Sequence, residues 1–216
     1  MPRVTPETAE VRLAGARYLI GVVLLSAVYF ATGKLGLLMD AVSGFATTVW
    51  PPTGIALVAL TLFGYRLWPG IALGALLVNV SAGAPPLVAC GMAAGNTLEA
   101  LLGVYLLRRF AEFTGSLDRV STVLKSIVLA AGLSTMVSAT LGVASGYFGG
   151  IIPRADWPRA WMTWWLGDAM GDLVLAPLLF IWRRPAPRLT MAQLVEGGAL
   201  LPTLVTVTIL LFGAGL

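Results

Sequence analysis

The sequence predicts an all-α fold, a polytopic helical membrane bundle of about seven spans. Of the 216 residues, 58% are apolar and only 11% are charged, whereas soluble domains carry about 25% charged residues. The apolar residues also occur in runs long enough to cross a bilayer. No polar linker of useful length interrupts them. We therefore expect one transmembrane domain over residues 1–216, with residues 1–16 as a cytoplasmic lead-in and no soluble output domain.

Apolar runs and turn residues place the spans in order. We expect them near 17–39, 51–64, 67–82, 86–108, 120–148, 159–182 and 192–214. Lys and Arg are enriched in cytoplasmic loops, and eleven of them fall on the side of the N-terminus, against Arg154 and Arg159 on the other side. This distribution predicts a multi-pass protein of the bacterial inner membrane with a cytoplasmic N-terminus. A cytoplasmic output would then need an eighth span beyond this chain.

The second predicted span is short or irregular. Proline is tolerated at the first position of a helix, and tryptophan favours the headgroup level. We therefore expect Pro51 and Pro52 to begin this helix. Trp50 should lie at the outer membrane surface, on the rim of the site. About 13 residues then remain before Tyr65, and they reach roughly 20 Å, short of the bilayer core of about 30 Å. Residues 43–49 should supply the missing depth as non-helical chain, which must be buried in protein or line a wet cavity.

Two later spans carry paired polar residues. Asn96 and Glu99 lie three residues apart, and Asp168 and Asp172 lie four apart, so each pair shares one helix face. Glycines spaced by multiples of four residues accompany both pairs, and such small residues let helices approach closely. They are Gly91, Gly95, Gly103, Gly167 and Gly171. This pattern directs both polar faces into the bundle.

Polar residues inside a membrane are costly, and they are usually paired or functional. The candidate ligand-binding residues are Lys34, Trp50, Asn79, Asn96, Glu99, Asp168 and Asp172. Within the predicted spans they concentrate toward the outer half, which predicts a cup open to the outside. The alternative is a closed network in which Lys34 pairs with one acid and the other groups bond across helices. A path for protons or cations is a third option.

Several kinds of site are excluded or not expected. The chain has no histidine and one cysteine, Cys90, which excludes an internal disulfide, a cysteine metal site and a Ser-His-Asp set. We expect no metal, no cofactor and no nucleic-acid partner. An enzyme is not expected either, because two acids on one helix cannot clamp a substrate from two sides. The hydroxyl groups near residues 134–140 are expected to bond backbone carbonyls between helices; they belong to Ser134, Thr135, Ser138 and Thr140.

Three segments together resemble a known family. They read "VWPPTGIALVALTLFGYRLWPGIALGALLVN", "AAGNTLEALLGVYLLRRF" and "WWLGDAMGDLVLAPLLFIW". In this order they resemble the membrane-associated sensor domain of the first type, the MASE family, over residues 45–182. The resemblance implies a bacterial inner-membrane sensor module, found N-terminal to histidine kinases, diguanylate cyclases and phosphodiesterases.

The combined expectation is an integral membrane signal-input domain. It would perceive a small molecule or a membrane partner from the outer side, and it would regulate a cytoplasmic kinase of a two-component system or a cyclic-di-GMP output absent from this chain. The expected partners are the lipid bilayer, a small-molecule ligand or a second membrane protein, and a second copy through the full-length output region. The alternatives are a small solute-binding or transport membrane subunit and a purely structural anchor.

Overall fold

The structure is a computed structural model that describes residues 6–38, 44, 46–111 and 120–182, with scattered positions between 190 and 203. These residues form helices and turns, and none of them forms an extended β-strand. The chain divides into two compact units, Met1–Ile181 and Trp182–Leu216. All candidate site residues lie in the first unit. The seventh predicted span, 192–214, lies largely outside the described residues.

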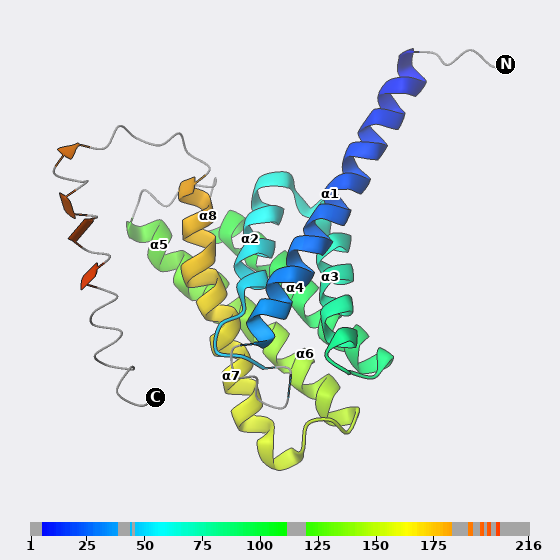
Figure 1. Cartoon of the computed structure of the whole chain (residues 1–216), viewed down its shortest axis with the longest axis vertical. Coiled ribbons are helices and arrows are strands. Elements are labelled where there is room, and N and C mark those ends of the chain that lie inside the picture. The colour runs from blue at the N-terminus through cyan, green and yellow to red at the C-terminus, as the bar shows by residue number, and fades with distance from the viewer. Residues whose placement is uncertain are drawn as a thin grey trace. The chain divides into compact units, whose positions relative to one another are not determined.

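Figure 1 shows the order and the antiparallel course of the helices. The α-helices are α1 (Pro6–Leu37), α2 (Pro51–Phe63), α3 (Trp68–Ser81), α4 (Pro86–Phe110), α5 (Val120–Ser126), α6 (Thr135–Phe148), α7 (Trp157–Met170) and α8 (Ala176–Trp182). Two short 3-10 turns, η1 (Tyr65–Leu67) and η3 (Arg154–Asp156), precede α3 and α7. Two π-helical segments, η2 (Ile127–Ser134) and η4 (Gly171–Leu175), join α5 to α6 and α7 to α8 as continuous helices.

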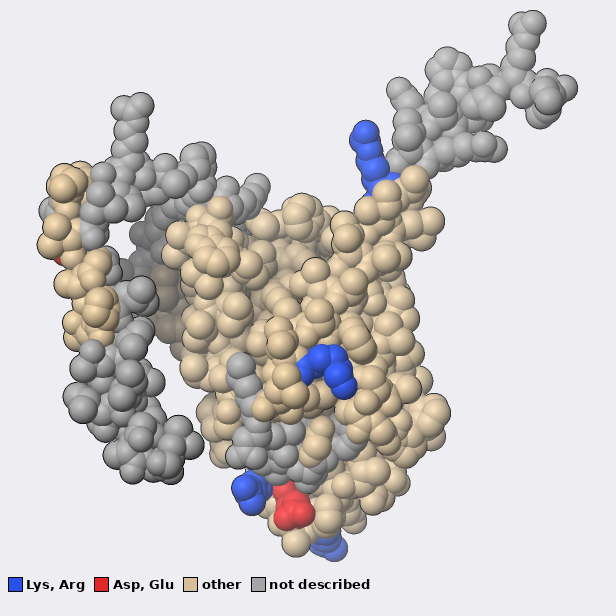
Figure 2. Space-filling model, viewed as in Figure 1, with Lys and Arg blue, Asp and Glu red and all other residues tan. Residues whose placement is uncertain are grey.

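Four described helices are long and apolar enough to cross a membrane, and α2 is a shorter apolar helix. The four are Gly15–Leu37, Pro86–Phe110, Ser121–Phe148 and Arg154–Trp182. The helix order follows the first six predicted spans, but seven spans are not confirmed. Large apolar side chains face outward, such as Leu19 at 61% and Phe63 at 72% exposure, and the face in Figure 2 carries few charged residues. Such a surface suits lipid and not water.

Proline and glycine mark the helix boundaries, as predicted for the second span. Proline lacks the N–H that the first helical turn leaves unbonded, so it fits there without loss. It stands in the first turn of α2, α3, α4 and α7, as Pro51, Pro69, Pro86 and Pro158. After α2 and α6, Gly64 and Gly150 adopt positive φ angles of 92° and 75°, which favour glycine because it has no Cβ.

The small residues of α4 pack closely against α6, which confirms the spacing argument. A Cβ on Gly91 would overlap the side chain of Ser145, and one on Gly95 would lie 3.1 Å from the Cβ of Leu141. Gly103 likewise faces the start of α6, where its Cβ would lie 3.0 Å from the hydroxyl of Ser134. The polar face of α4 that carries Asn96 and Glu99 is therefore directed inward.

Non-helical chain enters the bundle ahead of α2. Residues 46–50 have no helical structure, and Ala46 and Thr47 are each 2% exposed. The backbone N–H of Trp50 donates to the carbonyl oxygen of Gly167 at 2.9 Å. Because α7 begins at Trp157, Gly167 lies about 15 Å along that helix. Within the predicted irregular segment 43–49, Ala46 and Thr47 are thus confirmed as buried chain, whereas Gly44 and Thr48 are exposed.

Candidate functional site

Asp168 on α7 is the centre of the polar site. Its side chain is fully buried, at 0% exposure. Thr53 Oγ1 donates a hydrogen bond to Asp168 Oδ1 at 2.9 Å. Thr53 is the third residue of α2, so the carboxyl group lies beside a helix N-terminus, where the helix dipole favours negative charge. Pro51 and Pro52 have no N–H to offer, and the hydroxyl of Thr53 provides the donor in their place.

Glu99 on α4 brings a second carboxyl group to the same place. It is 2% exposed, and its side chain interacts with those of Asp168 and Ser138. Glu99 Oε1 and Asp168 Oδ2 have no hydrogen-bond donor among the described residues. Because ionised carboxylate oxygens only accept hydrogen bonds, the two groups attract each other only when a proton or another donor lies between them.

Ser138 on α6 connects further side chains to the two carboxyl groups. Its Oγ donates to Asn96 Oδ1 at 3.4 Å and accepts from Trp164 Nε1 at 3.1 Å. Its single proton also faces Glu99 and Asp168. In this cluster, acceptor atoms therefore outnumber donor protons. We refer to the group as the acid cluster: Thr53, Asn96, Glu99, Ser138, Trp164 and Asp168.

The structure brings together three of the predicted site residues, Asn96, Glu99 and Asp168. Their ligand-binding role stays a prediction. Sequence reasoning missed Thr53, Ser138 and Trp164 as members. The sequence did contain a signal for Thr53, which stands in the first turn of a helix that begins with two prolines. Donor groups in the first turn have no partner within the helix and can bond to a group beyond its end.

The hydroxyl groups at the end of η2 and in α6 behave differently from the prediction. Ser134 and Thr135 donate to the carbonyl oxygens of Ala130 and Ala131, at 2.7 Å each. Both bonds lie within one continuous helical segment. The prediction that these two hydroxyl groups bond carbonyls of other helices is therefore wrong. Ser138 instead bonds side chains of α4 and α7, because it lies one turn beyond Ser134 on the face that meets those helices.

Lys34 and Asn79 are two of the four candidate residues that lie outside the acid cluster. Lys34 is exposed, whereas the acids are buried, so the expectation that it neutralises one of them is wrong. Its neighbour Gly33 faces inward, against the ring of Trp50, and one residue of helix turns Lys34 about 100° away from that face. Asn79 is buried, but its Nδ2 donates to the carbonyl oxygen of Ala75 in its own helix at 2.8 Å.

Trp50 lies in the interior and not at a rim. It is 8% exposed, its ring packs against Gly36 of α1, and its Nε1 donates to the hydroxyl of Tyr29 at 3.4 Å. A cavity of about 10 Å³ adjoins it and reaches Asp168; a single water molecule needs about that much space. The lining residues are Ala46, Thr47, Trp50, Trp164 and Asp168. Around Trp50 and Asp168, where the cup was predicted, the described residues line only this small cavity.

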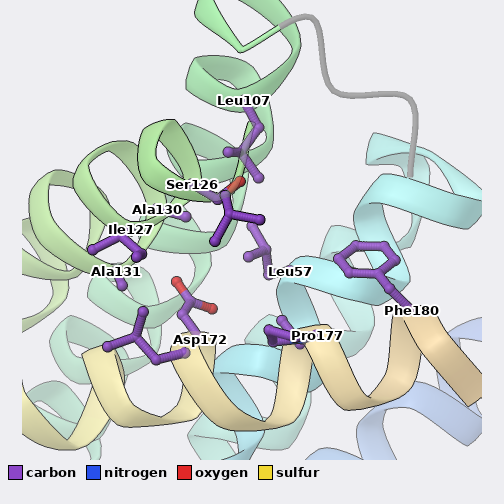
Figure 3. Close-up of a pocket in the computed structure, with 12 residues that line it drawn as sticks. Leu57, Leu107, Ser126, Ile127, Ala130, Ala131, Asp172, Pro177 and Phe180 are labelled. Atoms are coloured by element: carbon purple, nitrogen blue, oxygen red, sulfur yellow. The ribbon is translucent and has the colours of Figure 1, made fainter. Parts of the chain in front are cut away.

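Asp172 points into a separate cavity, which η2 and η4 help to line (Figure 3). It was predicted to share a helix face with Asp168. The helix changes to π-helical geometry at Gly171, and a π-helix holds more residues per turn than an α-helix. The two carboxyl groups line different cavities, although they lie four residues apart and are close enough for their charges to interact.

Comparisons with known proteins agree on one family. The family model MASE1 matches residues 19–216. The probable diguanylate cyclase DgcE of Escherichia coli (strain K12) is 26% identical over 199 residues, which cover 88% of this chain and 18% of that protein. The chain thus spans less than a fifth of the length of this relative. No solved structure matches significantly.

Proposed function

The chain belongs to the MASE1 family of membrane sensor domains, and we propose that it perceives a signal from the outer side of the inner membrane and passes it to a cytoplasmic output outside this chain. On this proposal the N-terminus is cytoplasmic, and the ends of α1 and α3 that lie near Trp50 and Asn79 face outward. The excess of Lys and Arg on the side of the N-terminus supports this orientation.

The acid cluster is the observation that carries the proposal. It joins the first turn of α2 to α4, α6 and α7 through side chains that are all buried. Its acceptors lack donors, and a buried network that is only partly satisfied is costly. Two arrangements of the helices, with different hydrogen bonds among these groups, can therefore have similar free energies. A signal that binds one arrangement more tightly than the other shifts the population toward it.

The signal would act on the chain around Thr47 and Trp50. Both residues line the cavity beside Asp168, and that cavity of about 10 Å³ has no room for an organic molecule in the present arrangement. We propose that a small molecule or a membrane partner binds over this segment and displaces it, which changes the bond between Thr53 and Asp168. The cavity beside Asp168 by itself offers no space for the alternative function, in which a solute-binding or transport subunit takes up a solute there.

The output is proposed from the relative. Because that protein is named a probable diguanylate cyclase, a cyclic-di-GMP output is the first candidate, and a histidine kinase is the second. A second copy of the chain would be recruited through the output region of the full-length protein.

A chimeric cyclase tests the function. The chain replaces the matching segment of the E. coli relative, and cellular cyclic-di-GMP is measured for the native chimera and for Glu99→Gln and Asp168→Asn. We expect both variants to change the cyclic-di-GMP level several-fold at equal membrane abundance. Asp156→Asn is the matched control, because Asp156 lies in η3 outside the cluster, and it should behave as native.

Two outcomes would contradict the proposal. Unchanged cyclic-di-GMP in both cluster variants would remove the acid cluster from signalling. Accumulation of a labelled solute in vesicles that contain the chain would favour a transport subunit instead.

A further inference from the structure

The cavity beside Asp172 lies between α2, α4, the two π-helical segments and α8. Its volume is about 110 Å³, roughly ten times that of the cavity beside Asp168. Figure 3 shows the carboxyl group of Asp172 rising from η4 into this space, toward Ile127 and Ala131 of η2. Most of the other lining side chains are apolar; they include Leu57, Leu107, Ala130, Leu173, Ala176 and Phe180.

One carboxyl oxygen of Asp172 lacks a donor among the described residues of this apolar surrounding. It is 6% exposed, and its Oδ1 has no hydrogen-bond partner among the described residues. The hydroxyl of Ser126, the other polar side chain of the lining, donates to the carbonyl oxygen of Thr122 at 2.8 Å. An unbonded polar atom in a dry site is unfavourable, so a molecule that brings one donor would gain from binding here.

The cavity is built from unusual backbone. Ile127, Ala130 and Ala131 belong to η2, and Asp172 and Leu173 belong to η4. π-Helical segments are rare and occur frequently at functional sites, because the extra residue per turn opens the helix locally. Two such segments converge on an acid whose Oδ1 has no hydrogen-bond partner among the described residues, and this points to a ligand independently of the cavity itself.

We propose that this cavity is a binding site for a small molecule with a compact apolar body and one hydrogen-bond-donating group, which bonds to Asp172. The volume sets the size, since a cavity of about 150 Å³ accepts benzene and this one is somewhat smaller. A five-membered ring with one N–H fits the description. The site is separate from the acid cluster and goes beyond the proposed signalling role, because binding here does not depend on the output.

Pyrrole and furan form a matched pair of probes. They have the same ring size, but only pyrrole carries an N–H donor. The 216-residue chain is placed in lipid nanodiscs, and binding of each probe is measured by saturation-transfer difference NMR, with protein-free nanodiscs as the reference for partition into lipid. We expect pyrrole to bind roughly tenfold more tightly than furan, the effect of one hydrogen bond to a charged or strongly polar acceptor.

Three variants separate the contribution of the Asp172 carboxyl group to binding from that of the cavity volume. Asp172→Leu should abolish the preference for pyrrole, and Asp156→Leu, which changes an acid of η3, should keep it. Ala131→Leu, which fills the cavity, should abolish the binding of both probes. The midpoint of thermal unfolding of each variant shows whether it is folded.

The native protein alone can overturn the proposal, whatever the variants do. Equal binding of pyrrole and furan would show that the cavity is an apolar void without a role for Asp172. Absence of protein-dependent binding of either probe would show that the space is not a ligand site. A pyrrole preference that survives in folded Asp172→Leu would show that another residue, and not Asp172, accepts the hydrogen bond of the pyrrole N–H.

Discussion

The hydroxyl of Thr53 donates a 2.9 Å hydrogen bond to Asp168, a residue 115 positions further along the chain. The bond fastens the first turn of α2 to α7 at the depth where the non-helical residues 46–50 enter the bundle. Next to this bond, the backbone N–H of Trp50 donates to the carbonyl oxygen of Gly167. Backbone and side-chain bonds thus meet at one buried contact between α7 and the start of α2.

Removing the hydroxyl of Thr53 should destabilise the bundle. Thr53→Val keeps the shape of the side chain but leaves Asp168 Oδ1 without its donor, at an expected cost of about 1–3 kcal/mol. Thr61→Val is the matched control in the same helix, because the Thr61 hydroxyl bonds only the Leu57 carbonyl of that helix. The midpoint of thermal unfolding in detergent compares the two, and equal midpoints would contradict a stabilising role for the bond to Asp168.

Converting Glu99 to an amide should stabilise the protein. In the native protein, the Glu99 carboxylate and Asp168 Oδ2 are both hydrogen-bond acceptors. The amide of Glu99→Gln can donate to Asp168 Oδ2, which should raise the free energy of unfolding by about 1 kcal/mol. The same change at the half-buried Asp156 should be neutral, within about 0.5 kcal/mol. Thermal unfolding measures both, and a Glu99→Gln protein that unfolds below the native midpoint would show that Glu99 already has a donor in the native protein.

Ser138 and Ser134 allow a comparison of two buried serines in consecutive turns, with exposures of 0% and 1%. Ser138→Ala removes the acceptor of Trp164 and a donor shared by three acceptors, so we expect a loss of about 1–3 kcal/mol. Ser134→Ala removes only a bond to its own helix, and a smaller loss should follow. The emission maximum of tryptophan fluorescence should shift in the first variant alone. A larger effect at Ser134 would contradict the network.

A methyl group at Gly167 should disrupt the contact between α7 and the chain ahead of α2. The Cβ of Gly167→Ala would overlap the carbonyl oxygen of Thr47, which is backbone and cannot rotate away. Overpacking of this kind costs about 1–3 kcal/mol. At Gly132 the added Cβ would meet only the carbonyl of Ile127 at 3.4 Å, so Gly132→Ala should be tolerated. Limited proteolysis near residues 46–50 and thermal unfolding should both separate the two variants.

The helices and their boundaries were readable from the sequence because their causes are local. Apolar length, proline in the first turn and glycine after the last turn act within a few residues, and they predicted α2 from Pro51 as well as buried non-helical chain before it. The glycine spacing of α4 also predicted its inward polar face, since helical periodicity alone fixes which residues share a side.

The partners of the polar residues were decided only by the tertiary structure. One residue along a helix rotates a side chain by about 100°, so Gly33 faces Trp50 while Lys34 points outward, and no local pattern distinguishes the two outcomes. Asp168 and Asp172 likewise line different cavities, although they lie four residues apart on one continuous helix. The sequence determined that acids lie inside a helical membrane domain; helix rotation and packing decided that Asp168 meets Thr53 and that Asp172 meets an apolar cavity.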